Sequence, residues 1–169
     1  MTKINQSLLS LSILWFSAFS AFANKARVPV SLNAQSDAAM QKMILHYVNE
    51  YRAKHHLRPL TLNASASQEA QKHSQAMARK TIPFGHANFN DRIHRVYQQF
   101  DNCQGGAENV AYYQWNAKRL VDAWVASPGH RRNIEGHYNV TGIGIAHGKP
   151  GWAYYTQIFV NTTAKKAFA

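Results

Sequence analysis

Two histidines and one glutamate stand in the segments of this chain that are richest in chemically active side chains. His86 follows a glycine, Glu108 lies in Ala107-Glu108-Asn109-Val110, and His130 lies in Ser127-Pro128-Gly129-His130. Imidazole and carboxylate groups bind divalent ions, Zn²⁺ above all, and they also act as general acids and bases. The three residues therefore predict a metal site or an acid–base site, provided that the fold brings them into one cleft.

Two further interpretations of the same trio stay open. In a hydrogen-bonded polar cluster, Glu108 would fix the tautomer of one histidine and no metal would bind. In a hydrolase, a metal-bound water would be the nucleophile and Glu108 the candidate catalytic base. A serine mechanism at Ser127 is disfavoured, because Ser-Pro is typical of a helix boundary and no nucleophile-elbow pattern surrounds it.

Several neighbouring residues are candidates for supporting the cleft. We expect Ser127 to cap the turn that carries His130, and asparagine side chains to hold nearby backbone groups. The arginines that follow His130 have a structural role or bind an anionic ligand, and the sequence leaves both open. The supporting residues that we expect are Asn109, Tyr112, Ser127, Arg132 and Asn133.

The N-terminal segment has the pattern of an export signal. Lys3 is followed by a short apolar run, and the run ends in Ala21-Phe22-Ala23, which is typical of a signal-peptidase site. An uncleaved anchor is the alternative. We expect residues 1–23 to be a cleaved signal peptide, 24–35 an N-terminal arm, 36–163 one domain and 164–169 a tail, with the mature protein periplasmic or secreted.

Composition limits the classes of partner. Lys and Arg number 19 against 8 Asp and Glu, a formal net charge of +11. Such a surface attracts an anionic glycan, a membrane surface or another anionic ligand, although it can also serve solubility alone. The composition argues against nucleic acid as a partner, because the basic residues are scattered and match no binding motif. With one cysteine, Cys103, the chain has no internal disulfide, and we expect a monomer.

Apolar periodicity and capping residues predict helices first and strands last. Four helices are predicted: one that begins at Ser36-Asp37, one over residues 64–80, one capped by Asn90-Asp91 and one capped by Asn116. Trp124 of the last helix is expected in the core. Residues 101–106 are expected to form a glycine-rich loop. The predicted strands are 110–113, 140–146 and 152–160, the last two joined by a hairpin turn. Because both faces of the last strand are apolar, we expect an α+β fold, a three-layer α-β-α sandwich around a central, mainly antiparallel sheet.

The motifs in their order resemble the CAP superfamily of cysteine-rich secretory, antigen 5 and pathogenesis-related proteins, and most closely its bacterial extracellular members. The resemblance covers about residues 38–160. The segments that carry it are Val48-Asn49-Glu50-Tyr51-Arg52, Pro59-Leu60, Ala70, His73-Ser74, Met77, Gly85-His86, Ala107-Glu108-Asn109-Val110, Trp124, Ser127-Pro128-Gly129-His130-Arg131-Arg132-Asn133-Ile134, Gly142-Ile143-Gly144 and Tyr155-Thr156-Gln157-Ile158-Phe159.

The resemblance implies an α-β-α sandwich with a central cleft that holds up to two histidines and two acidic residues, where some members bind a divalent metal. By motif, these residues are His86, His130 and Glu108. The second acid and the usual disulfides of animal members are absent, since Ala126-Ser127-Pro128 stands where that acid would be. We therefore expect an exported protein whose cleft binds a divalent metal and an unknown ligand. A metal-dependent hydrolase of peptide, glycan or lipid and a lipid or sterol binder are the alternatives, and whether the protein is an enzyme stays open.

Overall fold

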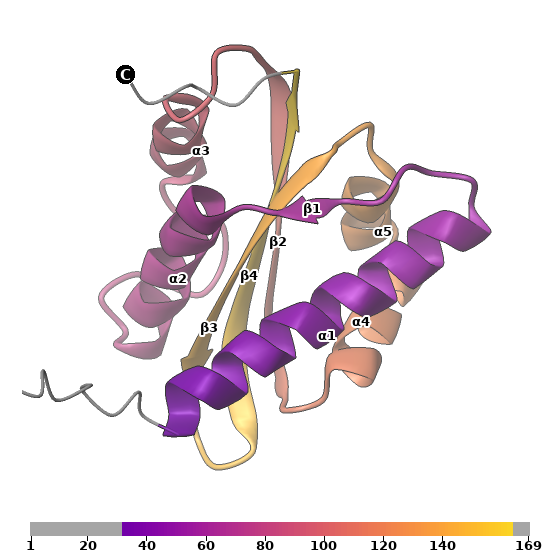
Figure 1. The fold of residues 1–169 in the computed structure, drawn as a ribbon. Coiled ribbons are helices and arrows are strands. Elements are labelled where there is room, and N and C mark those ends of the chain that lie inside the picture. Colours follow the sequence, from indigo (N-terminus) through magenta and orange to yellow (C-terminus); the bar gives the residue numbers. More distant parts are fainter. Residues whose placement is uncertain (1–31, 164–169) are drawn as a thin grey trace, which may run out of the picture.

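The computed structural model describes residues 32–163 and places a four-stranded sheet between two layers of helices (Figure 1). The strands are β1 (Thr61–Leu62), β2 (Cys103–Gln114), β3 (Val140–His147) and β4 (Trp152–Thr162), in the order β1-β3-β4-β2. β1 is parallel to β3, and the other two pairings are antiparallel. The predicted mainly antiparallel sheet is thus confirmed, with β1 as an additional strand that the sequence did not predict.

Each face of the sheet has its own helical layer. On one face lie α2 (Ala64–Ala78) and α3 (Phe89–Tyr97); on the other lie α1 (Leu32–Lys54), α4 (Ala117–Ala126) and α5 (Pro128–Glu135). The core of the second face includes Ile44 of α1, Trp124 of α4 and Phe159 of β4, all fully buried. The core of the first face includes Ala70 of α2 and Ile158 of β4. The three-layer α-β-α arrangement and the core position of Trp124 are confirmed.

Glycines in β3 set the distance between α2 and the sheet. A Cβ atom at Gly142 would lie 2.1 Å from the carbonyl carbon of Ala66, and one at Gly144 would lie 2.1 Å from that of Ala70. These contacts are with backbone atoms, which cannot rotate away. The small residues on α2 and the two glycines of β3 therefore allow a closer helix–sheet approach than any side chain would permit.

Two predicted boundaries are wrong. The first helix begins at Leu32 rather than at Ser36-Asp37, so residues 32–35 of the predicted arm are helical. Residues 103–106 belong to β2 rather than to a loop, with a register shift between Cys103 and Gly106. A Cβ atom at Gly106 would lie 2.6 Å from the end of the Ile93 side chain, so glycine allows α3 to pack closely against this part of β2. A glycine that fits strand packing was thus mistaken for one that marks a turn.

The segments on either side of the domain lie outside the described residues, and so do the predicted signal peptide and tail. Within residues 32–163, no helix is both long and apolar enough to cross a bilayer.

Candidate functional site

Glu108 is the most enclosed charged group of the site. It lies on β2, and its side chain is 1% exposed. Arg92 of α3, 4% exposed, donates from Nε to Oε2 at 2.7 Å and from Nη2 to Oε1 at 2.8 Å. A third bond, from Arg92 Nη1, reaches the Ala87 carbonyl at 3.1 Å. Both carboxylate oxygens therefore accept hydrogen bonds from one guanidinium, the bidentate geometry that is strongest for such pairs.

His86 lies between this ion pair and solvent. It follows Gly85, whose φ of 137° is a conformation that a side chain would strain. The Nδ1 atom of His86 is 2.9 Å from Glu108 Oε1, while 53% of the side chain stays exposed. The carboxylate thus holds the imidazole at one nitrogen, and the ring presents its exposed part to solvent.

His73 of α2 is a second histidine beside Glu108, and it is buried. Its Nδ1 atom lies 3.1 Å from Thr156 Oγ1 and 3.7 Å from Glu108 Oε2. Burial lowers the pKa of His73 to about 4, and the charge of Glu108 only partly opposes this shift. His73 is therefore neutral near pH 7 and acts as a packed polar group.

His130 lies in the first turn of α5, and hydrogen bonds from asparagine side chains to backbone carbonyls fix the position of this turn. The Nδ2 atom of Asn109 donates to the His130 carbonyl at 3.1 Å. Asn133 donates to the Glu108 carbonyl at 3.1 Å and to Asn109 Oδ1 at 2.9 Å. The two asparagines therefore tie α5 to β2. Burial, and secondarily the charge of His86, lowers the pKa of His130.

The exposed imidazole of His86 and the half-buried imidazole of His130 share a cleft of about 480 Å³. One wall is the segment Phe84-Gly85-His86, and the opposite wall comes from α4 and α5. The lining residues are Phe84, Gly85, His86, Val110, Ala111, Tyr112, Tyr113, Leu120, Ala123, Trp124, Ser127 and His130. Glu108 does not line this cleft; it lines a smaller hollow together with His86 and Asn133. The fold thus brings His86 near both partners but leaves Glu108 and His130 in separate hollows.

The floor of the cleft is the outer edge of the sheet. β2 is the last strand of the sheet and pairs on one side only, with β4. The Trp115 N–H donates to the Gly151 carbonyl across this pair at 2.8 Å, so odd-numbered residues of β2 direct their backbone groups toward β4. Because backbone direction alternates along a strand, Val110 and Tyr112 direct theirs outward. No hydrogen bond from residues 36–163 reaches these four outward groups.

The donor set argues against Glu108 as a metal ligand. Both of its oxygens accept hydrogen bonds from Arg92, and Oε1 also lies 2.9 Å from His86 Nδ1, so a metal ion at Glu108 would lie beside a positively charged guanidinium that repels it. Within the described chain, no three His, Cys, Asp or Glu side chains are grouped so that they could hold a metal ion. The trio of His86, Glu108 and His130 as a metal centre stays a prediction that this geometry does not support.

The remaining predicted residues have different surroundings. Ser127 occupies the N-cap position of α5, but its side chain makes no capping hydrogen bond. Tyr112 lines the cleft, and its ring stacks on Tyr154 with centroids 4.4 Å apart. Arg132 is exposed and makes no hydrogen bond or ion pair with any described side chain, whereas Arg131 donates to the Val125 carbonyl at 3.3 Å. Arg132 therefore gives the cleft no direct support.

The sequence did not identify Arg92 and His73 as site residues. Arg92 precedes Val96 by four residues and so shares its buried helix face with that apolar side chain. A charged residue on the apolar stripe of a short helix indicates a buried partner, and this signal was available. His73 lies on the inner face predicted for α2, which by itself predicts burial but no partner.

Comparison with known proteins identifies the family. The family model described as "CAP: Cysteine-rich secretory protein family" matches residues 45–159. The chain belongs to this family. Among curated relatives, it is 31% identical over 133 residues to the uncharacterized protein YkwD of Bacillus subtilis, covering 74% of this chain and 48% of YkwD. It is 29% identical over 126 residues to the uncharacterized membrane protein YlbC of the same species, covering 71% and 34%. The chain thus spans half or less of these relatives.

Solved structures show the same CAP fold. An outer surface protein of Borrelia burgdorferi superposes with a TM-score of 0.64 at 18% identity, covering 74% of this chain and 94% of that one. An extracellular protein with an SCP domain from Bacillus anthracis gives 0.64 at 23% identity, covering 80% and 45%. A cysteine-rich secretory protein from Staphylococcus aureus gives 0.59 at 20% identity, covering 74% and 39%. These likenesses establish the fold, and the residues of the cleft must carry any argument about function.

Proposed function

We propose that this CAP protein is an exported binding protein whose cleft holds an extended peptide segment along β2. The observation that carries the proposal is the unpaired edge of β2 at Val110 and Tyr112, lying between two imidazole-bearing walls. An extended peptide that joins a sheet edge has its own N–H and C=O groups at the matching spacing. A lipid chain has none, so it would leave these backbone groups without partners.

The edge alone supports weak binding. Val110 is 5% exposed, so Tyr112 is the more accessible of the two residues. Its two outward backbone groups, at about 1 kcal/mol net each, would contribute about 2 kcal/mol, which by itself corresponds to an affinity weaker than millimolar. Side-chain contacts must add the rest. Phe84, 58% exposed at the cleft wall, and the ring of Tyr112 provide apolar surface for them. The exposed part of His86 is available to a polar side chain of the peptide.

Export is part of the proposal. The N-terminal apolar run ending at Ala23 supports it, as do the descriptions of two structural relatives as extracellular and secretory proteins. Amino-terminal sequencing of the protein recovered outside the cytoplasm should begin at Asn24. Recovery of a membrane-bound protein that still begins at Met1 would support an uncleaved anchor instead.

Proline substitution tests the edge directly. A peptide selected from a random displayed library against the purified protein serves as the probe, and calorimetry measures its affinity. Tyr112→Pro removes one outward N–H and is compatible with an edge strand, whereas Tyr112→Ala removes the same ring and keeps the N–H. We expect Tyr112→Pro to bind the peptide about tenfold more weakly than Tyr112→Ala.

Two results would refute the peptide proposal. One is equal affinity of the two variants, which would mean that the outward N–H of residue 112 makes no bond to the ligand. The other is failure of repeated selections to yield any peptide that competes for the cleft. A matched folding control is Ala111→Pro, whose lost N–H points toward β4 and whose melting temperature should therefore fall well below that of Tyr112→Pro.

A further inference from the structure

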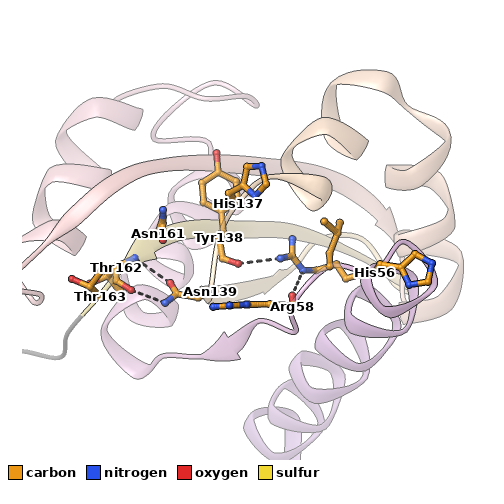
Figure 2. A pocket seen from close by; sticks show the side chains of 10 residues that line it. His56, Arg58, His137, Tyr138, Asn139, Asn161, Thr162 and Thr163 are labelled. Atoms are coloured by element: carbon orange, nitrogen blue, oxygen red, sulfur yellow. Dashed lines mark hydrogen bonds between the residues drawn. The ribbon is translucent and has the colours of Figure 1, made fainter.

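A second cavity, of about 670 Å³, lies at another part of the fold and shares no lining residue with the cleft. It is formed where the end of α1, the connections into β1 and β3, and the end of β4 meet. The residues that line it are Arg52, His56, Leu57, Arg58, His137, Tyr138, Asn139, Asn161, Thr162 and Thr163, and Figure 2 shows them from close by. We call it the basic pocket.

Its base holds a buried positive charge. Arg52 is 2% exposed, and its guanidinium donates to the backbone carbonyls of Arg58, Ile134, Gly136 and Tyr138. None of the described carboxylates forms an ion pair with it, so carbonyl dipoles alone compensate the charge. Burial lowers the pKa of Arg52. A guanidinium that is desolvated without a counterion favours an anion nearby.

The rim adds donors and no acid. His56, at the end of α1 with a φ of 57°, and His137, between α5 and β3, carry imidazoles, and Arg58 carries a second guanidinium; all three are exposed. The Arg58 side chain makes no hydrogen bond or ion pair within residues 36–163. None of the lining residues is acidic. Glu135, the acid nearest to His137 in sequence, accepts a bond from Tyr51 instead.

We propose that the basic pocket binds the phosphate group of a phosphate ester. The Arg58 guanidinium, two imidazoles and the Thr163 hydroxyl line the pocket from different elements, and several donors around one cavity suit phosphate, with three or more acceptor oxygens, better than a carboxylate with two. The volume is typical of sites for whole small molecules and far exceeds one phosphate ion. The cavity therefore has room for an organic part of the ligand besides phosphate. This site does not depend on the function proposed for the cleft.

Calorimetric titration at low ionic strength tests the pocket with three probes: inorganic phosphate, glycerol 3-phosphate and phosphatidylglycerol vesicles. We expect saturable binding of glycerol 3-phosphate to the purified protein, weakened at least tenfold in Arg58→Gln. His137→Gln should weaken it as well. The matched control is Arg79→Gln, which removes an equal charge from an exposed site at the end of α2 and should bind like the native protein. Binding of vesicles alone would identify a lipid headgroup as the source of the phosphate.

Three results would overturn the proposal. The first is no saturable binding of any probe. The second is equal weakening in Arg58→Gln and Arg79→Gln, which would indicate general attraction to a basic surface. The third is loss of binding in His130→Ala, which would place the phosphate in the cleft. Melting curves of each variant exclude unfolding as the cause, because the Arg58 and Arg79 side chains are exposed and should be replaceable without loss of stability.

Discussion

The buried pair of Arg92 and Glu108 gives the sharpest test of how this site is built. Replacing Arg92 with methionine keeps most of the side-chain volume and removes the guanidinium. The Glu108 carboxylate would then lose both of its short bonds, at 2.7 and 2.8 Å, and keep the contacts with His86 at 2.9 Å and with the neutral His73 at 3.7 Å. A charge in a site that is 1% exposed would be left without its counterion.

The expected cost follows from this burial. Removing one partner of a buried ion pair destabilises a protein by about 3–5 kcal/mol, because the remaining charge is desolvated and unpaired. Domains of this size are stable by about 5–15 kcal/mol. With a urea m-value of about 2 kcal/mol per molar, Arg92→Met should lower the midpoint of unfolding by about 2 M.

A double-mutant cycle separates the pair from other effects of the substitutions. Urea unfolding followed by tryptophan fluorescence is measured for the native protein, Arg92→Met, Glu108→Gln and the double variant. Replacement of both charges removes the unpaired ion, so the double variant should be markedly more stable than Arg92→Met alone. The matched control is Lys118→Met, which breaks an exposed pair with Asp122 and should leave the midpoint unchanged within error.

A small effect would refute this reasoning. If Arg92→Met lowered stability by less than about 1 kcal/mol, the pair would behave as a solvated surface bridge. If the double variant were as unstable as the sum of the single variants, the two side chains would not be coupled. Either result would mean that Glu108 is free to serve as a ligand or base.

Three other perturbations have expected outcomes. Gly144→Ala places a Cβ 2.1 Å from the Ala70 backbone and should cost more than about 3 kcal/mol, whereas Gly129→Ala on α5 meets nothing within 4 Å and should raise the melting temperature slightly. His73 has a folded pKa of about 4 against 6.5 in the unfolded chain, so its contribution to the free energy of unfolding is present above pH 6.5. That contribution is lost as the pH falls toward 4, by up to about 1.4 kcal/mol per pH unit. His73→Asn should therefore make the urea midpoint depend less on pH across that range. In calorimetric Zn²⁺ titrations, we expect Glu108→Gln to give the same result as the native protein, and saturable binding that Glu108→Gln abolishes would restore Glu108 as a metal ligand.

Local patterns predicted much of the fold. Asn116 caps α4, as expected, by accepting a bond from the Arg119 N–H at 3.0 Å, and the hairpin joins β3 and β4 as predicted. Capping and hairpin geometry depend on residues within a few positions, so the sequence displays them directly. The first residues of β2, up to Gly106, were predicted to be a loop because the packing of Gly106 against the Ile93 side chain involves a different element, α3, and is not visible in the local sequence.

The site was less predictable because its partners come from distant segments. Spacing identified His86, Glu108 and His130 as candidates, and the structure places His86 beside Glu108. Nothing in the local sequence says that Glu108 pairs with Arg92, 16 residues earlier. Long-range ion pairing depends on how α3 lies against β2, and a single sequence does not specify that docking.

The Arg92 pair changes what the cleft is suited to do. With both oxygens held by Arg92, Glu108 fixes His86 on one side, while its backbone carbonyl accepts a bond from Asn133 on α5. The carboxylate thereby connects α3, β2 and the segment before α3, and it lines a hollow separate from His130. What the cleft offers a ligand is then two imidazoles, aromatic surface and the unpaired edge of β2. Such a set of groups favours recognition of an extended chain over proton transfer by Glu108, and the Arg92→Met cycle tests the premise on which this inference depends.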